Sequence, residues 1–417
     1  MNESANATQV FLVGTCITGT GKEPIRDAAV VVRAGRIIQV GPRSAVSYDA
    51  KNSQVVDRAS STMIPGLIDS HTHIFLKGDR TFVQAHLVFQ ISRVMHNAAE
   101  VLRMGVTTIR DLGTATGNAD IYFRDAVNAG FFRGPRIFTS GDPIRMTAGM
   151  TGPTAMGIGI DGPDEARRVA RLQLEAGSDV LKVFATEGVG YSRAARQLAL
   201  PAHLRRPTPK VPGFKGRVQM TVEEMRAVVE EAHKVGVTVA SHAIETEGIK
   251  NALRAGVDSV EHGAGLDDEA IDMMVKQGTS LVPTMSILHT IGYRGEEFEY
   301  PPDHSESARR WYDRQVIAVR KARAAGIRIA TGTDSINNDT IPMECGKLVE
   351  VGFTPMEAIV AATKAGAEIL RKADDLGTIE TGKKADLVIL SANPLKVIGA
   401  LERVELVVKE GEIVKEG

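Results

Sequence analysis

Eight short apolar runs alternate with helix-like segments through the middle of the chain, and this alternation constrains the fold most. Each run has the length and β-branched content of a buried strand. Strands that alternate with helices predict a parallel sheet, and eight repeats favour an α/β fold of the (β/α)8 TIM barrel type. The runs are Met63–Ile68, Val106–Asp111, Arg136–Ser140, Val180–Ala185, Val237–Ala240, Ser259–Val260, Ser280–Pro283 and Arg328–Ala330.

The segments between these runs carry helix signals. Thr221–Val235 opens with Thr-Val-Glu-Glu, which is typical of a capped helix with an acidic first turn. Gly236 follows it as a C-terminal glycine, and Asp164–Ala176 and Asp267–Gln277 end at glycine in the same way. An open doubly wound sheet is the competing architecture, and it would carry a glycine-rich phosphate loop after its first strand. The first run here leads instead into His71-Thr72-His73, which favours the barrel.

Both ends of the chain are rich in short β-branched runs. We expect tight turns at Ala34-Gly35-Arg36 and at Glu410-Gly411-Glu412. The two ends together predict one small β-sandwich domain, formed by residues 1–63 and 376–417. Residues 64–375 are then the barrel domain, which would carry the catalytic chemistry.

Composition excludes several classes of protein. The 417 residues are 43% hydrophobic and 24% charged, with a formal net charge of −1, so no global field favours nucleic acid or an anionic membrane. No apolar stretch reaches transmembrane length and no secretory signal is visible at the N-terminus. The two cysteines, Cys16 and Cys345, fit a reducing cytoplasm. We expect a cytoplasmic homo-oligomer that acts on a small molecule, with no nucleic-acid or membrane partner.

His71 and His73 end the first strand. They are two residues apart, so both side chains point to the same side and can share one divalent ion. His242 and His262 end the fifth and sixth strands and together could hold a second ion. Asp334 ends the eighth strand, where a carboxylate can touch a metal ion and accept a proton from a water molecule.

Lys182 lies within the apolar fourth strand, where an isolated charged amine would be costly. One remedy is deprotonation and reaction with carbon dioxide, since the resulting carbamate could bridge two cations. The alternative is an ion pair with a buried carboxylate, for which Glu187 is a candidate. With four histidines and an aspartate at neighbouring strand ends, we favour the bridging carbamate.

At this point the chain resembles the amidohydrolase superfamily over nearly its full length. The resemblance is to the branch of prolidase-like and imidazolonepropionase-related enzymes. It implies hydrolysis of an amide or related bond by metal-activated water. It also implies that His71, His73 and Asp334 hold one ion, that Lys182 bridges as a carbamate, and that His242 and His262 hold the other. The segments that carry it are Pro65–His73, Gly105–Gly113, Val180–Phe184, Ser241–Ala243, Ala255–Gly263, Gly332–Asp334 and Gly382–Val388.

Two segments depart from that branch, and both fall where substrate is selected. Prolidase-like relatives often carry a substrate-contacting histidine near the place of Met150, and the proline-rich segment Tyr191–Val218 is longer than expected. We expect zinc as the metal, because imidazole and carboxylate-like oxygen suit it best, with manganese, cobalt or iron as alternatives. Candidate substrate contacts, chosen by position, are Tyr191, Arg193, Arg145 and His289.

Three functions compete. The first is a binuclear hydrolase of an amide bond in an Xaa-Pro-like dipeptide, an N-acyl amino acid or a xenobiotic amide or carbamate. The second is a mononuclear deaminase of the same superfamily, because His242-Ala-Ile-Glu245 has the His-x-x-Glu spacing with glutamate as proton shuttle. The third is a non-catalytic assembly protein, which a complete set of buried polar ligands disfavours.

Overall fold

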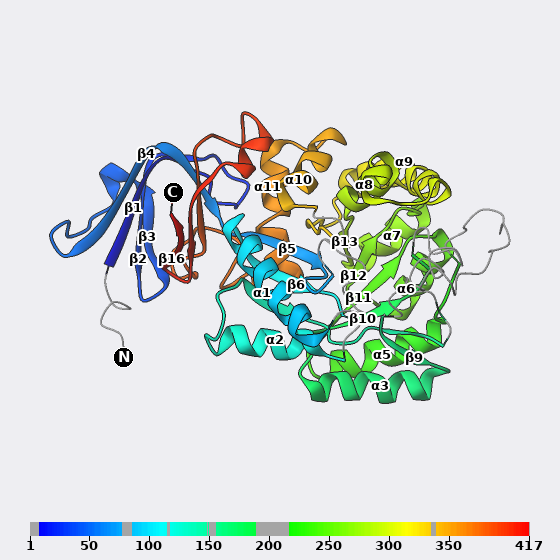
Figure 1. The fold of residues 1–417 in the computed structure, drawn as a ribbon. Coiled ribbons are helices and arrows are strands. Elements are labelled where there is room, and N and C mark those ends of the chain that lie inside the picture. The colour runs from blue at the N-terminus through cyan, green and yellow to red at the C-terminus, as the bar shows by residue number, and fades with distance from the viewer. Residues whose placement is uncertain are drawn as a thin grey trace.

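The computed structural model describes residues 8–76, 86–114, 117–147, 149, 156–188, 217–334 and 339–416. Strands from both ends of the chain form one sheet, and parallel strands with helices make up the remainder (Figure 1). The sheet from the two ends has seven strands in the order β16-β15-β14-β4-β1-β2-β3. Its strands are β1 (Thr8–Cys16), β2 (Ile25–Arg33), β3 (Arg36–Pro42), β4 (Ser53–Pro65), β14 (Leu387–Leu390), β15 (Val404–Lys409) and β16 (Glu412–Glu416).

The β4 strand joins the two halves of this sheet. It runs parallel to β1 over most of its length, and its last residues, Thr62 to Pro65, pair antiparallel with β14. Among the described residues the seven strands are therefore one continuous sheet, and the predicted two-sheet sandwich is not seen. The two predicted turns are confirmed. Both central residues have positive φ at Ala34-Gly35 (49° and 75°) and at Glu410-Gly411 (50° and 80°), as a tight hairpin turn requires.

The middle of the chain forms two parallel sheets. One has the order β5-β6-β7 and the other the order β13-β12-β11-β10-β8-β9. The parallel strands are short and mostly buried, which is typical of sheets covered by helices. They are β5 (Leu67–Thr72), β6 (Val106–Asp111), β7 (Arg136–Thr139), β8 (Ile144–Met146), β9 (Ile158–Ile160), β10 (Val180–Phe184), β11 (Thr238–Ala243), β12 (Ser259–His262) and β13 (Ser280–Val282).

Backbone hydrogen bonds also run between these two sheets. At one side the N–H of Asp179, just before β10, donates to the carbonyl of Thr139 at the end of β7 (2.8 Å). At the other side, Leu281 of β13 donates to Arg328 (2.9 Å), and Ser70 of β5 donates to Thr331 (2.9 Å). The segment 328–331 thus connects β13 with β5, so strand ends far apart in the sequence meet.

The helices pack against the parallel strands, and Met225, Val228 and Ala232 of α5 belong to the main hydrophobic core. Thr221 and Glu224 form a capping box, which confirms the predicted start of α5. Gly177 and Gly278 end α3 and α7 with positive φ, as predicted. The helices are α1 (Leu87–Arg103), α2 (Ala119–Asn128), α3 (Pro163–Ala176), α5 (Val222–Lys234), α6 (Thr246–Ala255), α7 (Asp268–Gln277), α8 (Met285–Tyr293), α9 (Pro302–Ala324), α10 (Ile341–Glu350), α11 (Pro355–Ala361) and α12 (Lys364–Ile369), with short 3-10 helices at Arg43–Ala45, Gly295–Phe298 and Ile398–Glu402.

Within the described ranges, no helix is both long and apolar enough to cross a bilayer.

Candidate metal centre

Four histidine rings meet at the carboxyl ends of β5, β11 and β12. His71 is the penultimate residue of β5 and His73 follows the strand, so the two side chains share one face, with ring centroids 5.3 Å apart. His262 ends β12, and its ring lies 5.0 Å from that of His71. His242 of β11 lies 4.6 Å from His262. All four rings are buried, so they form one polar group inside the protein.

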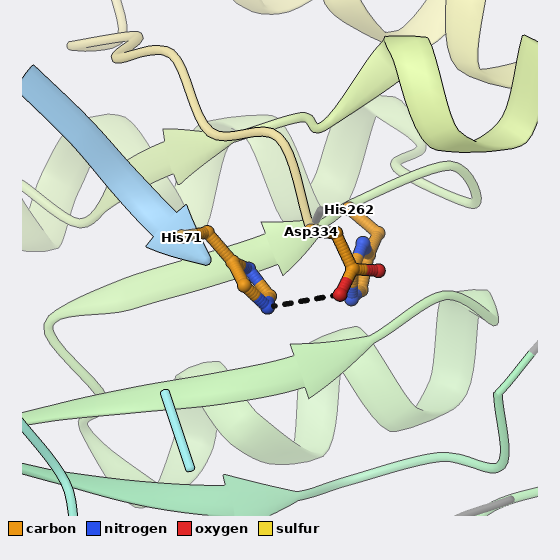
Figure 2. Close-up of side chains that lie close together, drawn as sticks. All are labelled: His71, His262 and Asp334. Atoms are coloured by element: carbon orange, nitrogen blue, oxygen red, sulfur yellow. Dashed lines mark ion pairs between the residues drawn. The ribbon is translucent and has the colours of Figure 1, made fainter. Parts of the chain in front are cut away.

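Asp334 reaches this group from the segment that follows Arg328. Its carboxylate Oδ1 lies 3.2 Å from Nε2 of His73 and 3.7 Å from Nε2 of His71. Ligand atoms of Asp334, His71 and His262 lie within 4.8 Å of one another, which is close enough for one metal ion to contact all three. Figure 2 shows these three side chains converging, with the ion pair between Asp334 and His71 dashed.

The approach of Asp334 depends on its neighbours in Gly332-Thr333-Asp334. A Cβ on Gly332 would lie 2.7 Å from Cβ of His71, so only glycine lets this segment pass so close to β5. Thr333 donates its hydroxyl to the carboxylate of Asp69 on β5 (2.6 Å). The N–H of Asp334 donates to the carbonyl of His71 (2.7 Å). These contacts explain why glycine precedes the aspartate in this sequence.

Lys182 lies on β10 with its side chain 2% exposed. In the described part of the chain, its Nζ has no hydrogen-bond partner. Nζ lies 5.8 Å from the ring centroid of Phe184, and its charge lowers the pKa of His71, His242 and His262, so the amine is close to the histidine group. The predicted alternative, an ion pair with Glu187, is not formed. A buried amine without a partner is costly, and a group that completes the site would relieve that cost.

The second ring nitrogen of each histidine is held by protein oxygen. The N–H of His73 Nδ1 donates to the carbonyl of Gly113 (2.8 Å), and that of His242 Nε2 to the carbonyl of Glu187 (3.2 Å). Contacts of the same kind join His71 Nδ1 to Glu261 Oε2 (2.8 Å) and His262 Nδ1 to Thr284 Oγ1 (2.7 Å). At His71 and His242 the opposite nitrogen is thereby left with its lone pair, as in histidines that bind metal, whereas Nε2 of His73 lies 3.2 Å from the carboxylate of Asp334.

The charges of the site agree with metal binding. Burial lowers the pKa of His71, His242 and His262 well below the ordinary value, so these rings are neutral near pH 7. Burial also lowers the pKa of His73, but its hydrogen bond with Asp334 and the charge of that carboxylate raise it above the ordinary value. Burial raises the pKa of Asp334, but the hydrogen bond with His73 and the charges of His71, His73 and Lys182 together lower it below the ordinary value, so this carboxylate is ionised at neutral pH.

Three residues of the site have left-handed backbone. The φ angles are 71° at His262, 49° at Thr284 and 50° at Asp334, a region that non-glycine residues adopt at a cost. The side chain of Gln315, on α9, donates from Nε2 to the carbonyls of both His262 (2.8 Å) and Pro283 (2.5 Å). Gln315 thus links the ends of β12 and β13 beside the left-handed residues His262 and Thr284.

Arg110 and Glu261 belong to the site but were missed by sequence reasoning. They lie on β6 and β12, and both are fully buried. Nη2 of Arg110 donates to Oε1 of Glu261 (2.8 Å), and the other oxygen of Glu261 accepts from His71. The available signal was Arg110 near the end of the run Val106–Asp111 and Glu261 directly after the run Ser259–Val260, because a charge in a buried strand needs an opposite charge as partner.

Two of the four predicted substrate contacts, Arg145 and His289, lie within the described residues, and their role stays a prediction. Arg145, on β8, donates to the carbonyls of Met146 (3.1 Å) and Met156 (3.0 Å). His289, on α8, packs against the rings of Tyr293 and Tyr312, with centroids 5.1 and 5.3 Å away. Tyr191, Arg193 and Met150 lie outside the described residues, as does the proline-rich segment except for its last two residues.

Glu245, the proton shuttle of the competing deaminase, caps a helix. Its carboxylate accepts from the N–H groups of Glu247 (2.9 Å) and Gly248 (3.4 Å) at the start of α6. A carboxylate engaged in this way is held by the helix N-terminus. The geometry therefore gives the deaminase reading no support from Glu245.

Comparison with known proteins agrees with this geometry. The profile of the amidohydrolase family matches residues 62–414. An ochratoxinase from Aspergillus niger is 29% identical over 429 aligned positions, which cover 95% of this chain and 83% of that protein. An imidazolonepropionase from Rhizobium rhizogenes is 29% identical over 394 positions, 88% of each chain. The crystal structure of a putative prolidase from Bifidobacterium longum superimposes with a TM-score of 0.82 at 33% identity, over 98% of this chain and 96% of that one.

Proposed function

Because this chain belongs to the amidohydrolase family, we propose that it cleaves a carbon–nitrogen bond with water and two divalent metal ions. The observation that carries this proposal is the unpartnered amine of Lys182 beside four buried histidines and Asp334. Each histidine has one nitrogen engaged by protein oxygen, and a metal ion would bind the other, at His73 in place of the hydrogen bond with Asp334. This donor set fits zinc, with manganese, cobalt or iron as alternatives.

The residues divide into two groups of ligands. We assign one ion to His71, His73 and Asp334, and the other to His242 and His262, with Lys182 between them as a carbamate. When bound, the two ions would lower the pKa of a water molecule and polarise the carbonyl of the bond to be cut. The ionised carboxylate of Asp334 accepts the proton of that water and delivers it to the nitrogen of the leaving amine. The side chain of Asp334 is 16% exposed, so substrate can approach it.

The carbamate forms by addition of the neutral amine to carbon dioxide. A bond forms between Nζ and the carbon, one carbon–oxygen electron pair moves onto oxygen, and Nζ releases a proton. Burial lowers the pKa of Lys182 from 10.5 to about 8, against the opposing charges of Glu261 and Asp334. The neutral, reactive amine is therefore present at a lower pH than in an exposed lysine.

This shift predicts a pH profile for metal-free protein. At a fixed concentration of dissolved carbon dioxide, the rate of carbamate formation should rise about tenfold per pH unit below pH 8 and level off above it. The rate can be followed by carbon-13 NMR with labelled carbon dioxide, and Lys182→Met is the control that should give no signal from this site. A rate that keeps rising until pH 10.5, as for an exposed lysine, would contradict the proposal.

The substrate is proposed by class. The ochratoxinase, imidazolonepropionase and prolidase relatives favour an amide-type carbon–nitrogen bond. We propose an Xaa-Pro-like dipeptide, an N-acyl amino acid or a xenobiotic amide or carbamate. The test is a panel of these three classes with protein stripped by a chelator and reloaded with zinc, manganese or cobalt. Hydrolysis that disappears on stripping and returns on reloading, with two ions per chain, is expected. Inactivity of the reloaded protein on the whole panel would refute it.

We also propose that the parallel strands close into a (β/α)8 barrel, comprising residues 64–375, beside a small domain from residues 1–63 and 376–417. The hydrogen bonds from Asp179 to Thr139, from Leu281 to Arg328 and from Ser70 to Thr331 support closure, since they continue the sheets on both sides. The cytoplasmic location, the homo-oligomer and the lack of nucleic-acid and membrane partners stay predictions.

A further inference from the structure

Arg110 and Glu261 form a buried ion pair, and the second carboxylate oxygen of Glu261 contacts His71, a candidate metal ligand. Arg110 lies on β6, Glu261 on β12 and His71 on β5, so the contact crosses between the two parallel sheets. Their side chains are 1% exposed at most. Nη2 of Arg110 donates to Oε1 of Glu261 (2.8 Å), and Nδ1 of His71 lies 2.8 Å from Oε2. Each oxygen of Glu261 therefore has its own partner.

The pair is fully satisfied, which fixes its geometry. Arg110 also donates from Nε to the carbonyl of Ser70 (2.5 Å) and from Nη1 to the hydroxyl of Ser259 (3.1 Å). Ser259 in turn donates to Oε1 of Glu261 (2.5 Å). A carboxylate held between a guanidinium and a hydroxyl donor is an acceptor at both oxygens. Nδ1 of His71 must then carry the hydrogen, and the lone pair is on Nε2, 3.7 Å from Asp334.

His71 differs in this from the other three histidines. Nδ1 of His73 and Nε2 of His242 donate to backbone carbonyls, and Nδ1 of His262 contacts the hydroxyl of Thr284, so at these nitrogens all three have neutral partners. Only His71, of these four, has a carboxylate behind it. A carboxylate that accepts from the distal nitrogen makes an imidazole a stronger metal ligand and fixes its orientation.

We propose that Arg110 and Glu261 are positioning residues that hold His71 as the Nδ1–H tautomer and thereby set the affinity of the first metal ion. This inference rests on the proposed function, because it assumes that His71 binds metal. It assigns to the ion pair a role beyond stabilising the fold. This role can be tested separately from stability, because Oε1 of Glu261 accepts from Arg110 whereas Oε2 accepts from His71, and a substituted side chain can keep one contact and change the other.

Glu261→Gln makes this separation. A glutamine has one oxygen and one NH2 group, and Arg110, which can only donate, requires the oxygen. The NH2 group then faces His71 and donates to Nδ1, which moves the ring hydrogen to Nε2. We expect long-range proton–nitrogen NMR of metal-free protein with labelled histidine to show the tautomer of His71 reversed. His73, whose partner is the carbonyl of Gly113, is the internal control in the same spectrum.

Metal affinity should change with the tautomer. Zinc affinity of the full chain, measured by competition with a chelator, should fall by about 10- to 100-fold in Glu261→Gln. Adding Arg110→Met removes the guanidinium that holds the glutamine oxygen, so the side-chain amide can rotate and present its oxygen to His71. The double variant should regain the Nδ1–H tautomer of His71 and part of the zinc affinity, although it has also lost the hydrogen bonds of Arg110. A purely structural pair predicts further loss instead.

The outcomes are distinguishable. If Glu261→Gln keeps both the Nδ1–H tautomer of His71 and the zinc affinity of the wild type, the inference is overturned and the proposed function stands. If the wild type binds no zinc, manganese or cobalt, the proposed function fails and the inference fails with it. Should the double variant not fold, the tautomer and affinity of Glu261→Gln alone still decide.

Discussion

Asp334→Asn is expected to lower kcat by about 1,000-fold or more while Tm changes little. Removal of a general base costs typically 100- to 10,000-fold, and this variant also loses a negatively charged metal ligand. The fold should survive, because asparagine has the same shape and is among the residues that tolerate the left-handed φ of 50° found here. Its side-chain oxygen can still accept from His73. Steady-state kinetics, Tm and metal content measured together would test this.

The control for Asp334→Asn is Asp268→Asn, which makes the same chemical change on α7. Asp268 is 84% exposed and pairs with Lys321 at the surface, so activity should stay near that of the wild type. If Asp334→Asn retains near-normal turnover with a full metal complement, Asp334 does not transfer the proton. Loss of activity with loss of both ions would instead limit its role to metal binding.

Lys182→Ala is expected to lose metal and activity together. Outer partners of metal ligands typically contribute 10- to 100-fold to affinity or activity, so loss of a bridging ligand should cost more than about 100-fold. The shortened side chain leaves space beside the histidines, and a small carboxylic acid should fill it and partly restore both metal content and rate. Metal analysis and kinetics, with and without the acid, are the measurements. Unchanged occupancy and rate would contradict the carbamate.

Lys182→Met is the matched variant. It keeps the apolar stem, leaves little room for an added acid and should show no rescue. Its effect on the metal-free fold should be the opposite of its effect on activity. The unpartnered Nζ costs about 1–3 kcal/mol of stability when buried, and methionine removes that cost. A higher Tm with lost activity would show that the lysine is retained for function at the expense of stability.

The sequence predicted local structure where one short segment carries the whole signal. The capping box at Thr221 and the spacing of His71 and His73 depend only on neighbouring residues, so each could be read directly. Lys182 was identifiable because a lone amine in an apolar strand needs an explanation.

Features that depend on distant pairing could not be predicted in this way. Glu261 and Arg110 are 151 residues apart, and their contact depends on the register of strands in two sheets. The left-handed backbone at His262 and Asp334 could not be predicted, because neither position holds glycine, the residue that usually indicates such a backbone. His289 was chosen by its place after a strand, and its role in binding substrate stays a prediction; its packing against Tyr293 and Tyr312 depends on the phase of α8, which that place does not indicate.

The sheet built from both ends of the chain has a consequence during synthesis. The edge of β4 at Thr62–Pro65 pairs with β14, which the ribosome makes roughly 320 residues later. At about 5–20 residues per second, that edge stays without its β14 partner for about 16–64 s while the intervening residues are made. Met63 and Ile64, which are fully buried in the folded protein, belong to this temporarily unpaired edge. Unpaired apolar strands attract other chains. Conditions that slow translation should therefore increase aggregation of this protein, and a chaperone that covers strand edges should counteract it.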